Sequence, residues 1–228
     1  MCSRSADPAR PTDRSVRALL RWGTAQLREC LKNAAPGSAE TPYLDTLLLL
    51  GLAAGETTER LMAMLPDYVS APASERFRGY IETRCKGTPV SYIRGTKEFY
   101  GREFIVSPSV LVPRPDTEVV VEIALETIDR FATRPASARA AGAPARSDVP
   151  LHLHDACTGS GCIALTIAAE RQDILVSGSD ISLAALDVAT RNRDRISSAK
   201  RVDLWGSDLL ETLEEECRRR SLPAPSII

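Results

Sequence analysis

Residues 151–208 alternate between short apolar runs and amphipathic runs, and this alternation limits the possible folds more than any other feature. The strand-like runs are LHLHDAC (151–157), ILVSGSD (174–180) and VDLWGSD (202–208), with the helix-like runs CIALTIAAERQ (162–172) and SLAALDVATRNRDRI (182–196) between them. Strands that alternate with helices of this length form βαβ units, whose strands are parallel. The sequence therefore predicts an α/β domain built on a parallel sheet.

The first third of the chain has a helical pattern instead. Apolar residues recur at helical spacing in SVRALLRWGTAQLREC (15–30), YLDTLLLLGLAAG (43–55) and SERFRGYIETRCKG (74–87). In the third run, Ser74 is a candidate N-cap and Gly87 a candidate stop. We expect a small helical bundle over residues 14–88.

A connector is expected over residues 89–118, where aromatic and β-branched residues alternate with polar ones on both sides of Gly101. This pattern is typical of a β-hairpin. Two prolines then end the second strand, and Asp116 with Thr117 can cap a helix over 118–131. The α/β domain would follow over 119–228.

Composition and charge argue against a nucleic-acid partner and a membrane span, and they mark one segment as flexible. The chain has 29 Lys and Arg against 30 Asp and Glu, so no overall basic charge indicates a nucleic-acid partner. The stretch LDTLLLLGLAAG (44–55) is too short to span a bilayer. Residues 132–150 are rich in Ala, Pro, Arg and Ser, which predicts a flexible insertion.

The cysteines and histidines show no metal-binding pattern. Six cysteines are scattered without a C-x-x-C pair, which argues against a zinc site and against a secreted disulfide framework. We therefore expect a cytoplasmic protein. His152 and His154 fall on one face of a strand without a visible third ligand, so we expect them to pack within the sheet.

The stretch DACTGSGCIAL (155–165) places a glycine-bearing turn between a strand and a helix. Ligands of this fold bind at that edge, on backbone amides and the helix N-terminus. Asp180 ends the next strand, where a carboxylate can accept hydrogen bonds from both hydroxyls of a ribose. A dinucleotide and a methyl donor both suit this geometry; Ala164 could replace the third glycine of the dinucleotide fingerprint. A turn without a ligand is the plain structural alternative.

The chain resembles the HemK family of S-adenosylmethionine-dependent methyltransferases. The resemblance is carried by GTPVSYIRGTKEFYGREFIVSPSVLVPRPDTE (87–118), DACTGSGCIAL (155–165), SDIS (179–182) with the alanines and Asn192 that follow it, and SDLL (207–210). VPRPDTE (112–118) is the most specific piece, since it lies outside the generic methyltransferase fold. The resemblance implies a Rossmann-like methyltransferase domain that N5-methylates the glutamine of the Gly-Gly-Gln loop in peptide chain release factors, with the helical bundle docking the release factor.

Site residues follow from the same resemblance. A loop of Cys157, Thr158, Gly159, Ser160 and Gly161 would surround the methionine part of S-adenosyl-L-methionine, although many members have Gly where Cys157 stands. The ribose would be held by Asp180, and the adenine would be bordered by Asp208 and Leu209. Three connector residues, Phe99, Arg114 and Glu118, would line the site. Four of these residues also have a purely structural interpretation. Phe99 can belong to the core, and Asp208 can cap a helix. Arg114 and Glu118 can pair with each other or cap a helix.

The family's substrate clamp, Asn-Pro-Pro-Tyr at the end of the fourth strand, does not occur in residues 1–228, so no catalytic residue is assigned. Ser226, Ile227 and Ile228 resemble the opening of that strand, which would lie beside the first. We expect a truncated or frameshifted member with little or no catalysis. The alternatives are a non-catalytic remnant that binds cofactor or release factor, and a nicotinamide-dependent dehydrogenase.

Overall fold

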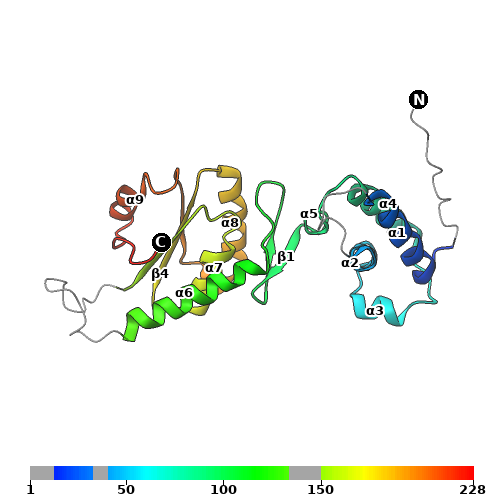
Figure 1. Ribbon diagram of the computed structural model, residues 1–228, viewed down its shortest axis with the longest axis horizontal. Coiled ribbons are helices and arrows are strands. Elements are labelled where there is room, and N and C mark those ends of the chain that lie inside the picture. The colour runs from blue at the N-terminus through cyan, green and yellow to red at the C-terminus, as the bar shows by residue number, and fades with distance from the viewer. Residues whose placement is uncertain (1–12, 33–40, 134–149) are drawn as a thin grey trace, which may run out of the picture. The chain divides into compact units, whose positions relative to one another are not determined.

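The computed structural model describes residues 13–32, 41–133 and 150–228 (Figure 1). The expected flexible insertion at 132–150 therefore lies almost entirely outside the described residues. The chain divides into two compact units, Met1–Arg94 and Gly95–Ile228.

The first unit is helical, as predicted. Its helices are α1 (Val16–Cys30), α2 (Pro42–Ala54), α3 (Thr58–Ala63), α4 (Ala71–Cys85) and α5 (Val90–Arg94). Their apolar faces share a core in which Leu19, Leu50 and Phe77 are fully buried. Helices α1, α2 and α4 approach closely at Gly23, where an added Cβ would lie 2.7 Å from Thr46 Cγ2 and 2.8 Å from Phe77 Cζ.

One local prediction in this unit is wrong, and one cysteine pair was not predicted. Helix α4 begins at Ala71 rather than after Ser74, because the Ser70 side chain accepts a hydrogen bond from Ala73 N and a proline occupies the first turn. Ser74 is buried inside the helix. Cys30 and Cys85, the last residues of α1 and α4, are bonded to each other with their Cα atoms 5.5 Å apart.

The second unit opens with the predicted hairpin, formed by β1 (Thr96–Phe99) and β2 (Arg102–Ile105). Tyr100 and Gly101 both have positive φ, of 49° and 69°, at its tip. Two left-handed residues form the turn that matches the twist of a two-stranded ribbon. Helix α6 (Asp116–Thr133) follows, and it starts at Asp116, two residues earlier than expected.

A three-stranded parallel sheet forms the centre of this unit, which confirms the α/β prediction. Its elements are β3 (His152–Ala156), α7 (Cys162–Glu170), β4 (Leu175–Asp180), α8 (Leu183–Arg195), the 3-10 turn η2 (Ser197–Ala199), β5 (Asp203–Gly206) and α9 (Leu213–Arg219). The strand order is β3-β4-β5. Beyond α9, Ser226 N donates to His152 O and His154 N donates to Ile227 O, so Ile227 lies beside β3 as expected for a further strand.

One side of the sheet carries a buried polar row. His152 Nε2 and His154 Nδ1 both lie within hydrogen-bonding distance of Ser177 Oγ, at 2.7 and 2.8 Å, and His154 Nε2 lies 3.0 Å from Ser179 Oγ. The His154 ring also stacks on Trp205, with centroids 4.9 Å apart. The histidines therefore pack within the sheet, as predicted. Within the described ranges, no helix combines the length and apolarity that crossing a membrane requires.

Candidate functional site

The loop from Cys157 to Gly161 connects β3 to α7 at the carboxyl edge of the sheet. Three of its residues have positive φ: Cys157 at 63°, Gly159 at 57° and Gly161 at 79°. The two glycines adopt this backbone without strain, but Cys157 does so against the preference of a residue with a Cβ. The position therefore favours glycine, which agrees with the glycine expected there from the family resemblance.

The Asp155 carboxylate accepts hydrogen bonds from this loop and from the start of α7. Its Oδ2 accepts hydrogen bonds from Thr158 Oγ1, at 2.7 Å, and from Ala164 N, at 3.2 Å. Desolvation raises the pKa of Asp155 to about 6, with a smaller contribution from the negative charge of Asp180. From the sequence, Asp155 was predicted only to end a strand. A Thr three residues after an Asp was the available signal for this contact.

Asp180 joins the end of β4 to the same loop. Its Oδ2 accepts from Gly159 N at 2.9 Å, and its Oδ1 accepts from Ser182 N at 2.9 Å. Thr158 N donates to Ser179 O at 2.8 Å, so two bonds hold the loop against the strand end. A carboxylate has about four acceptor positions, and these two amides leave capacity for ligand hydroxyls.

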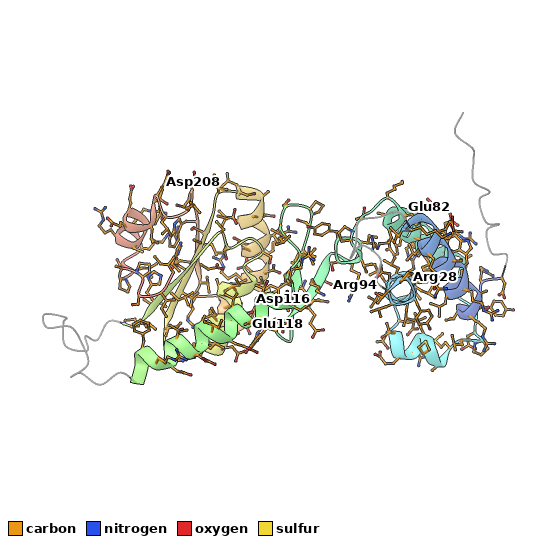
Figure 2. The ribbon with its side chains drawn as sticks, viewed as in Figure 1. Arg28, Glu82, Arg94, Asp116, Glu118 and Asp208 are labelled. Carbon is orange, nitrogen blue, oxygen red and sulfur yellow. A yellow bond between two sulfur atoms is a disulfide. The ribbon has the colours of Figure 1, made fainter. Side chains whose placement is uncertain are left out.

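Asp208 and Leu209 follow β5 at the same sheet edge. Both side chains are exposed, and Leu209 has a positive φ of 47°. Its carbonyl accepts a 3.5 Å hydrogen bond from Ser179 Oγ, which connects this segment to β4. The Asp208 carbonyl accepts from Glu211 N. Figure 2 labels the Asp208 side chain.

The three connector residues have different surroundings. Phe99 is fully buried and packs edge-to-face on Phe104, with centroids 6.0 Å apart, so its ring is part of the core. Glu118 Oε1 accepts from Tyr100 N at 2.9 Å and so holds the tip of the hairpin against α6 (Figure 2). Arg114 is exposed, and its carbonyl accepts from Thr117 N at the start of α6.

Asn192 joins the hairpin to the loop, and sequence reasoning assigned it no role. This fully buried residue of α8 donates from Nδ2 to Ile105 O and to Ser160 O, at 3.0 and 2.9 Å. Its Oδ1 accepts from Ile105 N at 2.6 Å. One amide side chain therefore ties β2, α8 and the loop together.

The chemistry of this edge fits a nucleoside with a charged tail. An added Cβ on Gly159 would meet no atom closer than Cys157 O at 4.0 Å, so open space lies over the loop. The N-terminus of α7 favours an anionic group, Asp180 can accept from hydroxyls, and exposed Leu209 offers apolar surface. Within residues 13–32, 41–133 and 150–228 no cluster of His, Cys, Asp or Glu could hold a metal ion.

Comparison with known proteins finds relatives whose similarity extends over both units. Residues 18–95 match the PrmC N-terminal domain family. The release factor glutamine methyltransferase of Moorella thermoacetica is 38% identical over 187 residues, which are 82% of this chain and 60% of that protein. The Bacillus subtilis protein of the same name is 35% identical over 84% of this chain and 58% of its own length.

Among solved structures, a SAM-dependent methyltransferase from Agrobacterium tumefaciens is 18% identical. The match covers 54% of this chain and 35% of that chain, with a TM-score of 0.37. The chain spans about three fifths of the length of the first relatives. Over about four fifths of its own length, this chain is similar in sequence to proteins named release factor glutamine methyltransferase.

Proposed function

We propose that this protein is a member of the group of S-adenosyl-L-methionine-dependent enzymes that N5-methylate the glutamine of the Gly-Gly-Gln loop in peptide chain release factors. The observation that carries the proposal is the attachment of the loop to the end of β4, where Gly159 N donates to the Asp180 carboxylate and Thr158 N donates to the Ser179 carbonyl. It sets an acceptor for ribose hydroxyls beside a helix N-terminus suited to the methionine carboxylate. The names of the sequence relatives support the choice of reaction and substrate.

In this reaction the glutamine amide nitrogen attacks the methyl carbon of the sulfonium. The carbon–sulfur bond breaks as the nitrogen–carbon bond forms, one amide proton leaves, and S-adenosylhomocysteine remains. The residues of this chain contribute by binding and orienting the methyl donor, with Cys157 to Gly161 around its methionine part, Asp180 at the ribose, and Asp208 and Leu209 at the adenine. Residues 1–228 contain no Asn-Pro-Pro-Tyr to hold the amide.

The remaining assignments belong to the same proposal. The helical unit docks the release factor. Arg114 and Glu118, at the end of the connector, line the site in which the substrate glutamine binds. Phe99 supports the hairpin from the core, since its ring is fully buried. Release factors act on ribosomes, so we propose that the protein works in the cytoplasm.

Calorimetric titration with S-adenosyl-L-methionine tests the cofactor assignment. We expect the 228-residue chain to bind the cofactor and Asp180→Asn to bind it at least about tenfold more weakly, because hydrogen bonds to a charged group are lost. Asp187→Asn is the matched control, since Asp187 lies on α8 and pairs with Arg191 in solvent. Binding of NAD instead of the methyl donor would support the dehydrogenase alternative and contradict the proposal.

Mass spectrometry of a release factor tests the transfer itself. Without Asn-Pro-Pro-Tyr, the 228-residue chain should add no methyl group above background even when saturated with cofactor. Transfer at the Gly-Gly-Gln glutamine would support the substrate but show that other residues hold the amide. Transfer to a different side chain would contradict the proposed substrate.

A further inference from the structure

The helical unit contains a pocket that the proposed function does not use. Its volume is about 270 Å³, and it lies along one face of α1, with Tyr43 of α2 and Leu65 on the far side. Leu20, Ala25 and Leu65 give it apolar walls, and Tyr43 is held by a hydrogen bond from its hydroxyl to Met62 Sδ at 3.3 Å. The pocket can therefore accept an apolar or ring-shaped group.

Three arginines, Arg17, Arg21 and Arg28, also line this pocket. Their spacing on α1 puts them on one helix face, and all three are exposed. Among the residues that the structure describes, none of the three forms an ion pair with a carboxylate. In the same unit, by contrast, Arg60 pairs with Glu56 and Arg84 pairs with Asp45. The pocket is therefore rich in positive charge without a counter-charge from the described protein.

This arrangement does not favour the helix that carries it. Arg17 lies in the first turn of α1, where the helix dipole disfavours a cation and no acidic residue is present. Arg17 and Arg21 are four residues apart, so their like charges repel on the helix surface. Only Arg28, in the last turn, is placed favourably (Figure 2). A bound anion would offset these costs.

Thr24 adds an unmet hydrogen-bonding group to the pocket lining. The residue is 7% exposed, and its hydroxyl has no hydrogen-bond partner within the described part of the chain. Buried hydroxyls in folded proteins are normally paired, so an unpaired one beside a cationic pocket calls for an explanation.

We infer that this pocket is a second ligand site, which binds a small organic phosphate: the phosphate on the arginines and the organic body against Leu20, Leu65 and Tyr43. Guanidinium groups bind phosphate oxygens through paired, charge-assisted hydrogen bonds. A group of several arginines therefore suits a doubly charged phosphate better than a singly charged carboxylate. The site lies entirely within the first unit and is independent of the methyl-donor site.

Phenyl phosphate is the probe, and the full 228-residue chain is titrated by calorimetry with and without saturating S-adenosylhomocysteine. We expect saturable binding that S-adenosylhomocysteine does not displace. Arg21→Gln combined with Arg28→Gln should weaken it by about tenfold or more, since two charged hydrogen-bond donors are removed. Arg60→Gln is the control, because Arg60 is an exposed arginine of the same unit that has a carboxylate partner.

Three results would overturn the inference. These are no saturable binding by the unsubstituted chain, equal affinity in the Arg21→Gln/Arg28→Gln variant, and equal affinity for inorganic phosphate, which would remove the organic part of the ligand. Because neither substituted arginine is in the core, circular dichroism should show both variants folded. Loss of cofactor binding at Asp180 would leave this result unchanged, so the two proposals fail separately.

Discussion

At the scale of single residues, two aspartates at the same sheet edge have different tasks. Asp155 faces inward and accepts from the loop it supports, through Thr158 and Ala164. Asp180 ends the next strand and accepts from Gly159 and Ser182. Burial raises the pKa of Asp155 to about 6, so near neutral pH its charge is held at a cost to stability. Asp155, which was not a predicted site residue, therefore sets the loop geometry that a nucleoside needs.

Asp155→Asn should therefore change how the stability of the second unit depends on pH. The folded pKa of about 6 lies above the unfolded value, so the native state gains from the protonated acid at low pH. That gain is lost as pH rises from about 4 through about 6, and it amounts to up to about 3 kcal/mol. Asparagine cannot ionise and can still accept from Thr158. Its advantage over aspartate should grow from pH 4 to pH 7.

Urea unfolding at a series of pH values measures this difference, with Trp205 as the only tryptophan in a Trp22→Phe background. His154 acts in the opposite direction, because burial lowers its pKa to about 4 and stability then falls as pH drops below its unfolded pKa. Since both proteins contain His154, its effect cancels in the difference. A stability difference between the Asp155→Asn variant and the parent chain that does not vary with pH would contradict the prediction.

At the scale of elements, the hairpin and the cofactor loop depend on one side chain. Asn192→Leu would leave Ile105 N–H, Ile105 C=O and Ser160 C=O without the partners they have in the fold. Loss of such buried bonds should cost about 2–4 kcal/mol. Hydrogen exchange at the Ile105 amide should accelerate, and cofactor affinity should fall because Ser160 is released.

Asn192→Asp is the matched variant, since its carboxylate still accepts from Ile105 N but donates to neither carbonyl. Its Ile105 amide should remain more protected than in Asn192→Leu. Equal exchange at Ile105 in Asn192→Leu and the unsubstituted chain would show that the hairpin is held by other contacts, such as the bond between Glu118 and Tyr100.

The elements also show where prediction from sequence ends. Alternation of short apolar runs with amphipathic ones was enough for the parallel sheet, and apolar spacing was enough for the helical unit. The start of α4 was missed because Ser70 and Ser74 are both good caps, and only the proline between them favours the earlier one. Asn192 belongs to a motif that carries the family resemblance, but its role was not predicted, because its partners are backbone atoms far away in the sequence.

At the scale of the whole molecule, the chain consists of two units with separate cores. Each unit contains one tryptophan: Trp22 packs on Phe77 in the first, and Trp205 stacks on His154 in the second. The cysteine pair is confined to the first unit, where it joins the ends of α1 and α4. Scattered positions in the sequence gave no reason to pair Cys30 with Cys85; helix packing brings them together.

Reduction of the cysteine pair should therefore destabilise one unit and spare the other. Breaking a cross-link over a separation of 55 residues should lower the stability of the helical unit by about 4 kcal/mol in the chain-entropy treatment. Thermal unfolding is followed with Trp205→Phe, which leaves Trp22 as reporter, and with Trp22→Phe, which leaves Trp205. A reductant should lower the midpoint reported by Trp22 and leave that of Trp205 in place, and Cys85→Ser should reproduce the shift without reductant. A common shift of both midpoints would mean that the two units unfold as one cooperative body.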